Sequence, residues 1–189
     1  RRCLLEHDRL TTARSSKPLQ SLWGVVQGAQ YEDLRRQAVR GLLGLDREAR
    51  DEGRRGFGGF GIGGALEKEN LGTIVGWVTD ELPVSMPRHL LGISEPDDIF
   101  TAVEAGADTF DCVAPTRLGR RGGVYTLDGR MNLAGARFKR DFAGVDEEFG
   151  GYVNLEFMIR LVDNIRAAID AGDYEAYRDE FLGRYYATT

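Results

Sequence analysis

Short apolar segments alternate with longer amphipathic segments through the first part of the chain. Four of the apolar segments predict strands, each ending in a polar or glycine-containing turn: Leu22–Val26, Phe60–Ile62, His89–Ile93 and Thr109–Val113. The intervening segments predict three helices: Tyr31–Leu45, Glu69–Leu82, and one that starts after Ser94 as N-cap and reaches about Ala105. In the first helix the predicted apolar face consists of Leu34, Ala38, Leu42 and Leu45. Strands and helices that alternate at this spacing are typical of right-handed βαβ units, so we expect a parallel sheet.

The pattern changes after the fourth strand. Two short strands around Asp128-Gly129 predict a β-hairpin with a two-residue turn: Val124–Leu127 and Arg130–Leu133. Two amphipathic helices are expected to follow, separated by Gly172: Val153–Ala171 and Asp173–Tyr186. The charged, glycine-rich stretch Arg47–Gly59 is the most linker-like part of the chain.

Composition narrows the class of protein. The chain has 189 residues, of which 42% are hydrophobic and 29% charged, as expected of one soluble globular domain. Its apolar runs are too short to span a bilayer. The two cysteines, Cys3 and Cys112, form no Cys-x-x-Cys pair, so we expect a reduced, cytoplasmic setting. A net charge of −5 argues against general coating of nucleic acid and leaves room for a local basic patch. Because the chain begins Arg1-Arg2-Cys3, we expect it to start inside a longer protein.

Candidate chemistry gathers at the predicted carboxyl ends of the strands, where functional residues of parallel α/β sheets collect. These ends carry Gln27, Gly63-Gly64, Gly92–Ser94 and Asp111. An amide, a bare backbone and a carboxylate around one edge suit a planar, hydrogen-bonding heterocycle. The alternative for Gln27 is a loop residue that caps the next helix. Gly59-x-Gly61-x-x-Gly64 has the spacing of a dinucleotide fingerprint, but its glycines lie within and beyond the strand, so we reject that interpretation.

Asp111 is the strongest candidate for covalent chemistry. A carboxylate of this kind attacks an anomeric carbon in retaining glycosidases, and double displacement preserves the configuration. Arg117, Arg120 and Arg121 follow it closely and suit contacts with backbone phosphates. The alternatives are an ion pair between Asp111 and Arg117, and a solvated basic loop.

Four segments together resemble the bacterial tRNA-guanine transglycosylase (queuine tRNA-ribosyltransferase) family, in order and at similar spacing. They are Leu22-Trp-Gly-Val-Val-Gln-Gly-Ala-Gln-Tyr31, Gly61-Ile-Gly-Gly-Ala65, Pro87-Arg-His-Leu-Leu-Gly-Ile-Ser-Glu-Pro-Asp-Asp98 and Phe110-Asp-Cys-Val-Ala-Pro-Thr-Arg117. The resemblance runs from the start to about Asp146 and resumes from about Asn154 to Tyr186. It implies a (β/α)₈ TIM-barrel fold, and a reaction that exchanges guanine at the anticodon wobble position of tRNA for a queuosine precursor, preQ₁.

The resemblance also implies roles for individual residues. Asp111 matches the nucleophile that attacks the ribose. The residues that match the binding site for the small deazaguanine base are Gln27, Gly63, Gly64, Ala65, Glu69 and Leu91. Two loops match those that contact RNA: Gly92, Ile93, Ser94, Glu95, Pro96, Asp97 and Asp98 in the first, and Thr116, Arg117, Leu118, Gly119 and Arg120 in the second.

Two departures from the family pattern shape the expected architecture. The family's amino-terminal half, with a second catalytic aspartate, has no counterpart, and four strands cannot close an eight-stranded barrel. The zinc subdomain is also missing: Asp146–Leu155 runs across its place, with Phe149 where the first cysteine ligand would stand. With two Cys and two His in the chain, we expect no metal and no cofactor.

We therefore expect one partial TIM-barrel domain over residues 1–189, about half a barrel. It comprises βα units in 1–123, a hairpin and truncated zinc-region remnant in 124–152, and carboxyl-terminal helices in 153–189. An open half-barrel leaves strand edges unpaired, so the isolated chain is expected to be unstable, to form homo-oligomers, or to bind a partner that supplies the missing strands.

Three hypotheses follow for the function. The first is a transglycosylase, or the carboxyl-terminal part of one, acting on tRNA with guanosine at the wobble position. The second is a non-catalytic tRNA-binding subunit or degenerate fragment of the same family. The third, an unrelated nucleotide-binding α/β protein, rests only on the alternation of strands and helices.

Overall fold

A computed structural model describes residues 1–12, 20–64, 67–93, 95–133, 135 and 150–187 of the chain. The chain divides into two compact units. The first unit comprises residues 1–93 and 101–111, and the second comprises residues 94–100 and 112–189. The single domain predicted over 1–189 stays a prediction.

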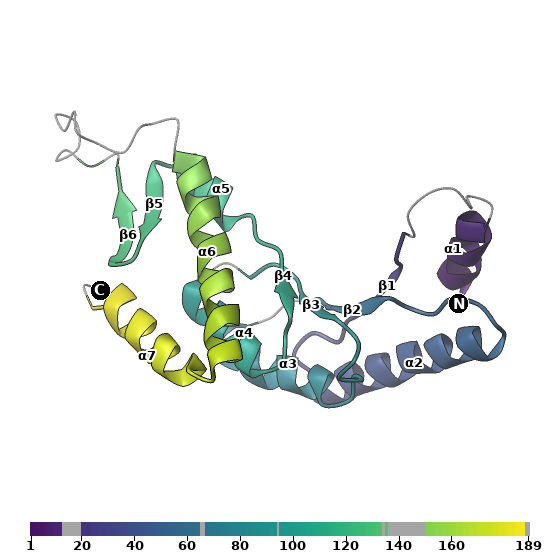
Figure 1. The fold of residues 1–189 in the computed structure, drawn as a ribbon. Helices are drawn as coiled ribbons and strands as arrows, with labels where there is room; N and C mark the ends of the chain where they lie inside the picture. The colour runs from purple at the N-terminus through teal and green to yellow at the C-terminus, as the bar shows by residue number, and fades with distance from the viewer. Residues whose placement is uncertain (13–19, 65–66, 94, 134, 136–149, 188–189) are drawn as a thin grey trace. The chain divides into compact units, whose positions relative to one another are not determined.

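The first unit is built on a four-stranded parallel sheet with strand order β1-β2-β3-β4 (Figure 1). Its strands are β1 (Trp23–Val26), β2 (Gly59–Ile62), β3 (Arg88–Leu90) and β4 (Thr109–Phe110). Each neighbouring pair is parallel. The predicted α/β class and the predicted parallel sheet are therefore confirmed. The third and fourth strands are shorter than predicted. They end at Leu90 and Phe110, three residues before the predicted ends at Ile93 and Val113.

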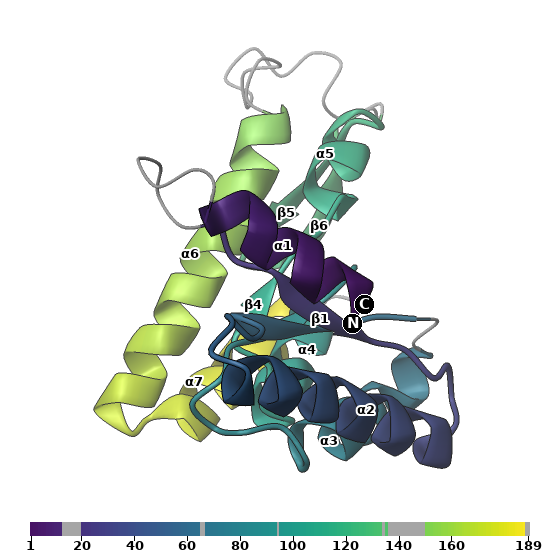
Figure 2. The ribbon, with the colours of Figure 1, turned by 90° about the vertical axis from the view of Figure 1, so that its right-hand side faces the viewer.

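Helices α2 (Glu32–Asp51) and α3 (Leu71–Thr79) lie on one side of this sheet, and both views show them there (Figures 1 and 2). A 3₁₀ turn, η1 (Lys68–Asn70), precedes α3, and α1 (Arg2–Thr12) precedes the sheet. The core between helices and sheet is formed by fully buried apolar residues: Val26, Val39, Phe60, Ile62, Ile74, Val75, Val78 and Leu90. Burial of this side is what fixes the strands in register, because a shift by one residue would expose the whole set.

Helix α2 differs from its prediction in length and in face. It continues to Asp51, so the first residues of the predicted linker-like stretch are helical. Leu34 of the predicted apolar face is 45% exposed, and the buried positions are Arg35, Val39, Asp46 and Ala49. Two charged residues are tolerated there because both bond the main chain: Asp46 Oδ1, for example, accepts from the Phe57 N–H at 2.6 Å. Helix α1 was not predicted.

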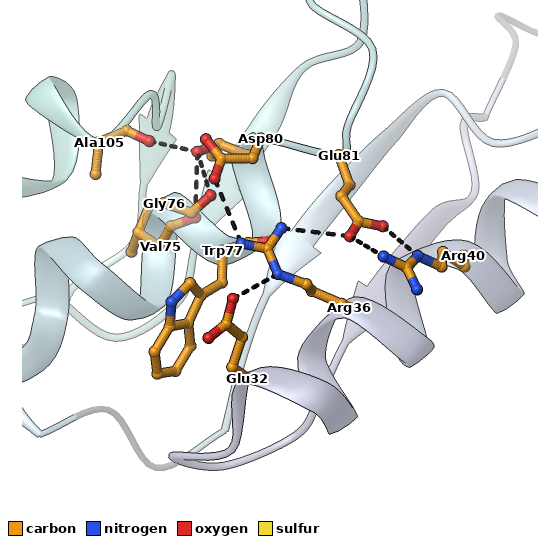
Figure 3. Close-up of polar contacts among 10 residues, drawn as sticks. Glu32, Arg36, Arg40, Val75, Gly76, Trp77, Asp80, Glu81 and Ala105 are labelled. Carbon is orange, nitrogen blue, oxygen red and sulfur yellow. Dashed lines mark hydrogen bonds and ion pairs between the residues drawn. The ribbon is translucent and has the colours of Figure 1, made fainter.

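An ion-pair network joins α2 to the turn after α3 (Figure 3). Glu81 accepts from Arg40 Nη2 at 2.7 Å and from Arg36 Nη1 at 3.3 Å. Arg36 also pairs with Glu32 at 2.7 Å and with Asp80 at 3.6 Å. Because Glu81 joins two guanidinium groups, and its side chain is 17% exposed, it is the central acid of the network.

Replacing Glu81 with glutamine is expected to destabilise the chain at neutral pH by about 1 kcal/mol. The hydrogen bond from Arg40, followed by that from Arg36, lowers the pKa of the Glu81 carboxyl below its usual 4.5. A carboxyl whose folded pKa lies below its unfolded value contributes stability above the unfolded value and loses it as the pH falls. The difference between wild type and Glu81→Gln in urea midpoint should therefore shrink below pH 4.5. Asp80→Asn, at the longer contact, is the control; an equal loss in both variants would contradict the central role of Glu81.

The second unit contains a separate antiparallel hairpin of β5 (Gly123–Thr126) and β6 (Gly129–Asn132). Thr126 pairs with Gly129, so the turn is Leu127-Asp128, one residue earlier than predicted. The Thr126 hydroxyl explains the shift, because it accepts from the Asp128 N–H at 3.2 Å and donates to the Gly129 carbonyl at 2.8 Å. The predicted hairpin is thus confirmed, with a different turn.

Three helices complete the second unit: α5 (Ala114–Gly119), α6 (Gly150–Ala171) and α7 (Tyr174–Tyr185). Gly172 adopts φ +80° and ends α6, as predicted. Rings of Phe100, Tyr125, Phe157, Phe181 and Tyr185 pack against one another in the core. Helix α4 (Pro96–Glu104) crosses the division between the units, with residues 96–100 in the second and 101–104 in the first.

Candidate functional site

Four predicted site residues occupy equivalent positions on the four strands of the first unit. The register aligns the last residues of the strands in one row: Val26, Ile62, Leu90 and Phe110. The residues that directly follow this row are Gln27, Gly63, Leu91 and Asp111. Because successive side chains alternate between the two faces of a sheet, this second row belongs to the face turned away from α2 and α3. We call these four residues the strand-end row.

Gln27 lies against the glycines at the end of β2. A Cβ atom added at Gly63 would lie 2.9 Å from Gln27 Nε2, and one added at Gly64 would lie 3.0 Å from Gln27 Oε1. Leu91 Cδ1 approaches from the other side, 3.1 Å from the same Gly63 position. The bare backbone at Gly63 leaves room for these two side-chain ends, and Gly64 adopts φ +94°, a conformation that favours glycine. The amide, the bare backbone and an apolar side chain meet at one place.

Asp111 closes the strand-end row at β4. Its Oδ1 atom accepts from the Gly92 N–H at 3.1 Å and lies 3.2 Å from His89 Nε2. Both hydrogen-bond contacts of the carboxylate with the described residues involve Oδ1 and not Oδ2, and the side chain is 58% exposed. One carboxylate oxygen is thus held by donors while the other remains accessible. The ion pair with Arg117 that the alternative interpretation requires would join the two units, and it stays untested.

Arg35, on α2, links the loop after β1 to the end of β2. It is 0% exposed on α2, and it donates to the Ala29 carbonyl at 2.8 Å and to the Gly63 carbonyl at 2.7 Å. Burial lowers the pKa of the Arg35 guanidinium. Ala29 has φ +48°, so this contact holds a loop conformation that alanine rarely adopts. The sequence analysis did not predict this role. The spacing of four between Arg35 and Val39 places both residues on one face of the helix, so it could have indicated a buried arginine.

Two further predicted base-site residues are not placed by these contacts. Glu69 lies exposed in η1. It is not among the described residues that contact the strand-end row in the distances given above. Ala65 lies outside the described residues. His89, in contrast, contacts Asp111, although the sequence analysis gave it no role at the site.

The predicted RNA-contacting residues fall in both units. In the first unit, Gly92 adopts φ +80° and bonds Asp111, and Ile93 is buried. Ser94, the predicted N-cap, lies outside the described residues. In the second unit, Glu95 pairs with Arg130 and Asp97 accepts from the Tyr186 hydroxyl at 2.8 Å, while Pro96 and Asp98 lie in the first turn of α4.

The second predicted RNA segment is helical rather than a loop. Helix α5 contains Thr116, Arg117, Leu118 and Gly119, and Arg120 is its C-cap. Pro115 near its start favours this helix, and the Thr116 hydroxyl donates to the Val113 carbonyl at 3.1 Å. Within the described parts of the chain, Arg117, Arg120 and Arg121 are exposed and none takes part in a recorded ion pair.

The described residues contain no group of three or more His, Cys, Asp or Glu that could hold a metal ion. The predicted loss of the zinc subdomain concerns a segment that includes Phe149 and lies largely outside the described residues, so it stays a prediction. Within the described ranges, every helix is too short or too polar to cross a membrane.

Comparison with known proteins gives the same family as the motifs. Residues 1–153 match the profile of the family described as queuine tRNA-ribosyltransferase. A queuine tRNA-ribosyltransferase of Bacillus subtilis is 35% identical over 214 residues, covering 97% of this chain and 52% of that protein. One of Fusobacterium nucleatum is 33% identical over 207 residues, covering 94% and 53%. One of Symbiobacterium thermophilum is 34% identical over 209 residues, covering 95% and 50%.

The chain spans about half the length of the curated relatives it matches. The aligned length also exceeds the 189 residues of the chain, so these alignments open gaps in it.

Proposed function

The chain belongs to the queuine tRNA-ribosyltransferase family, and from this premise we propose that it carries the nucleophile and part of the base site of a tRNA-guanine transglycosylase. The observation that carries the proposal is the strand-end row. Its register brings an amide, a glycine backbone, an apolar side chain and a carboxylate to one edge of a parallel sheet.

In the proposed reaction, the accessible oxygen of Asp111 attacks C1′ of the wobble guanosine. A bond forms between this oxygen and C1′ while the C1′–N9 bond breaks, and guanine leaves with the electron pair and takes up a proton from water. A deazaguanine such as preQ₁ then gives its N9 proton to water, attacks C1′ from the face that guanine left, and displaces the carboxylate. Two displacements retain the configuration of the sugar.

The other residues of the strand-end row are proposed to bind the bases. Gln27 offers a donor and an acceptor in one plane, and Gly63 and Gly64 leave the main chain open to close approach. Leu91 supplies an apolar surface, while Ala65 and Glu69 complete the proposed site. The exposed guanidinium groups of Arg117 and Arg120 are proposed to contact RNA phosphates.

A partial (β/α)₈ barrel is the proposed architecture. Val25 and Leu91 are 47% and 38% exposed on the face turned away from α2 and α3. In a closed barrel the inward-facing residues of the strands are packed together. This exposure supports a face that further strands would cover.

The test uses an anticodon stem-loop with guanosine at the wobble position. Wild type is expected to form a denaturation-resistant adduct with the RNA, and Asp111→Asn is expected to lower its yield on the order of 1000-fold or more. Asp163→Asn, on the exposed face of α6, is the control and should keep the yield. An adduct that survives in Asp111→Asn would exclude Asp111 as the nucleophile.

The second candidate is a non-catalytic tRNA-binding subunit or a degenerate fragment. This candidate needs only the exposed guanidinium groups of Arg117, Arg120 and Arg121, which suit contacts with RNA phosphates. Salt-dependent binding of the stem-loop by wild type, without an adduct and without guanine exchange, would support this candidate. Exchange that returns when a separate amino-terminal half is added would support the enzyme instead.

A further inference from the structure

We propose that His89 is a positioning residue that aims the Asp111 carboxylate and leaves one defined oxygen free to attack. The inference rests on the proposed function and adds to it a role for a residue to which the sequence analysis gave none. Its basis is a contact between two adjacent strands. His89 lies on β3, and the register pairs it with Thr109 on β4.

The geometry follows from the period of a strand. Thr109 and Asp111 are two residues apart, so extended backbone brings their side chains to the same face. The imidazole of His89 lies against both: Nδ1 is 2.8 Å from Thr109 Oγ1, and Nε2 is 3.2 Å from Asp111 Oδ1. The Trp23 ring contacts the imidazole edge-on, with centroids 6.3 Å apart and planes at 85°. The ring is thus fixed from two strands.

Proton accounting assigns the direction of each bond. An ionised carboxylate only accepts, so His89 Nε2 must carry the proton that it shares with Asp111. In the neutral ring, Nδ1 then accepts from the Thr109 hydroxyl. The Asp111 carboxylate, which can only accept, therefore selects the tautomer in which His89 donates to it, and the Thr109 hydroxyl, which can donate as well as accept, satisfies the other nitrogen.

The consequence is an asymmetric carboxylate. Oδ1 accepts from two donors, the His89 imidazole and the Gly92 N–H, and its lone pairs are committed to them. Oδ2 is the oxygen left for C1′. Because a nucleophile displaced by about 1 Å can lose up to about 100-fold in rate, fixing the carboxylate in this way has a measurable effect on the chemical step.

The test separates the two nitrogens of the ring. The side-chain amide of glutamine places a nitrogen near the position of Nε2, whereas that of asparagine places one near Nδ1. His89→Gln is therefore expected to keep the adduct rate within about 10-fold of wild type, while His89→Asn and His89→Phe lose up to about 100-fold. The concentration of stem-loop that gives half the maximal rate should stay within about twofold in all three. Equal losses in all three variants, or a loss that lies in RNA affinity, would overturn the proposal.

A second measurement needs no activity. Nitrogen NMR of the imidazole is expected to show the Nε2-protonated tautomer in the wild-type chain, and Asp111→Ala should weaken that preference. A ring protonated at Nδ1, or one indifferent to Asp111→Ala, overturns the inference whatever the activity. If the tautomer is as expected but no adduct forms, even when a separate amino-terminal half is added, the proposed function fails, and the positioning role in catalysis fails with it.

Discussion

Asn154→Ala is expected to destabilise the second unit by at least about 3 kcal/mol. Asn154 is 0% exposed on α6, and its side chain satisfies three backbone groups. Oδ1 accepts from the Tyr125 N–H at 2.7 Å, and Nδ2 donates to the carbonyls of Gly123 at 2.9 Å and Pro115 at 3.1 Å. Alanine leaves all three groups buried without a partner, at a cost of about 1–3 kcal/mol each. Urea unfolding gives the loss, and hydrogen exchange at the Tyr125 amide should accelerate with it.

Asn154→Asp separates hydrogen bonding from loss of volume. Aspartate keeps the acceptor for Tyr125 but turns a second oxygen toward the carbonyls of Pro115 and Gly123. The folded state then favours the protonated acid, so the penalty is small below the ordinary aspartate pKa of about 3.9 and grows as the pH rises. At pH 7 this variant should be about as unstable as Asn154→Ala. Leu155→Ala, at a half-exposed neighbour, is the control. Losses in Asn154→Ala and Asn154→Asp that stay equal at every pH would contradict the assignment.

The elements were predictable because their signals are local. Apolar runs followed by amphipathic segments predicted the parallel sheet, and the predicted carboxyl ends of its strands carry Gln27, Gly63 and Asp111. The sheet register then brings these residues into one row, with Leu91 among them. The register itself follows from burial of the opposite face, so a correct apolar pattern already places the row.

What the sequence did not predict depends on contacts between distant segments. His89 faces Asp111 because β3 and β4 pair in one particular register. Arg35 and Asn154 are polar residues on buried helical faces, each four positions before a buried apolar residue, Val39 or Met158. Hydrophobic periodicity is read from apolar positions alone, so it does not identify a polar residue on the buried face. Such a residue is found only by considering which backbone groups would need a hydrogen-bond partner there. Such residues tie elements together and carry large stability effects.

Arg35 offers the second large effect, and here two contributions oppose each other. Removing the side chain leaves the carbonyls of Ala29 and Gly63 unpaired, at about 1–3 kcal/mol each. The guanidinium itself is expensive to bury, because Nη2 has no hydrogen-bond partner among the described residues and burial lowers its pKa. Arg35→Met fills the volume and removes the charge. Arg35→Lys keeps a charge that is more strongly hydrated and too compact for both carbonyls. Arg35→Ala also opens a cavity.

We therefore expect the loss of unfolding free energy to increase from Arg35→Met, through Arg35→Lys, to Arg35→Ala, with about 4 kcal/mol for alanine. Hydrogen exchange at residues 28–31 and 63 should accelerate in all three, including Arg35→Met, because both loops lose their shared donor. Arg36→Met, next along the helix but in the surface network, should leave this exchange unchanged. If Arg35→Met were as unstable as Arg35→Ala, the two charge-assisted bonds would outweigh the burial cost. If the loops stayed protected in Arg35→Met, the strand-end row would owe its shape to the backbone alone, and Arg35 would only fill space.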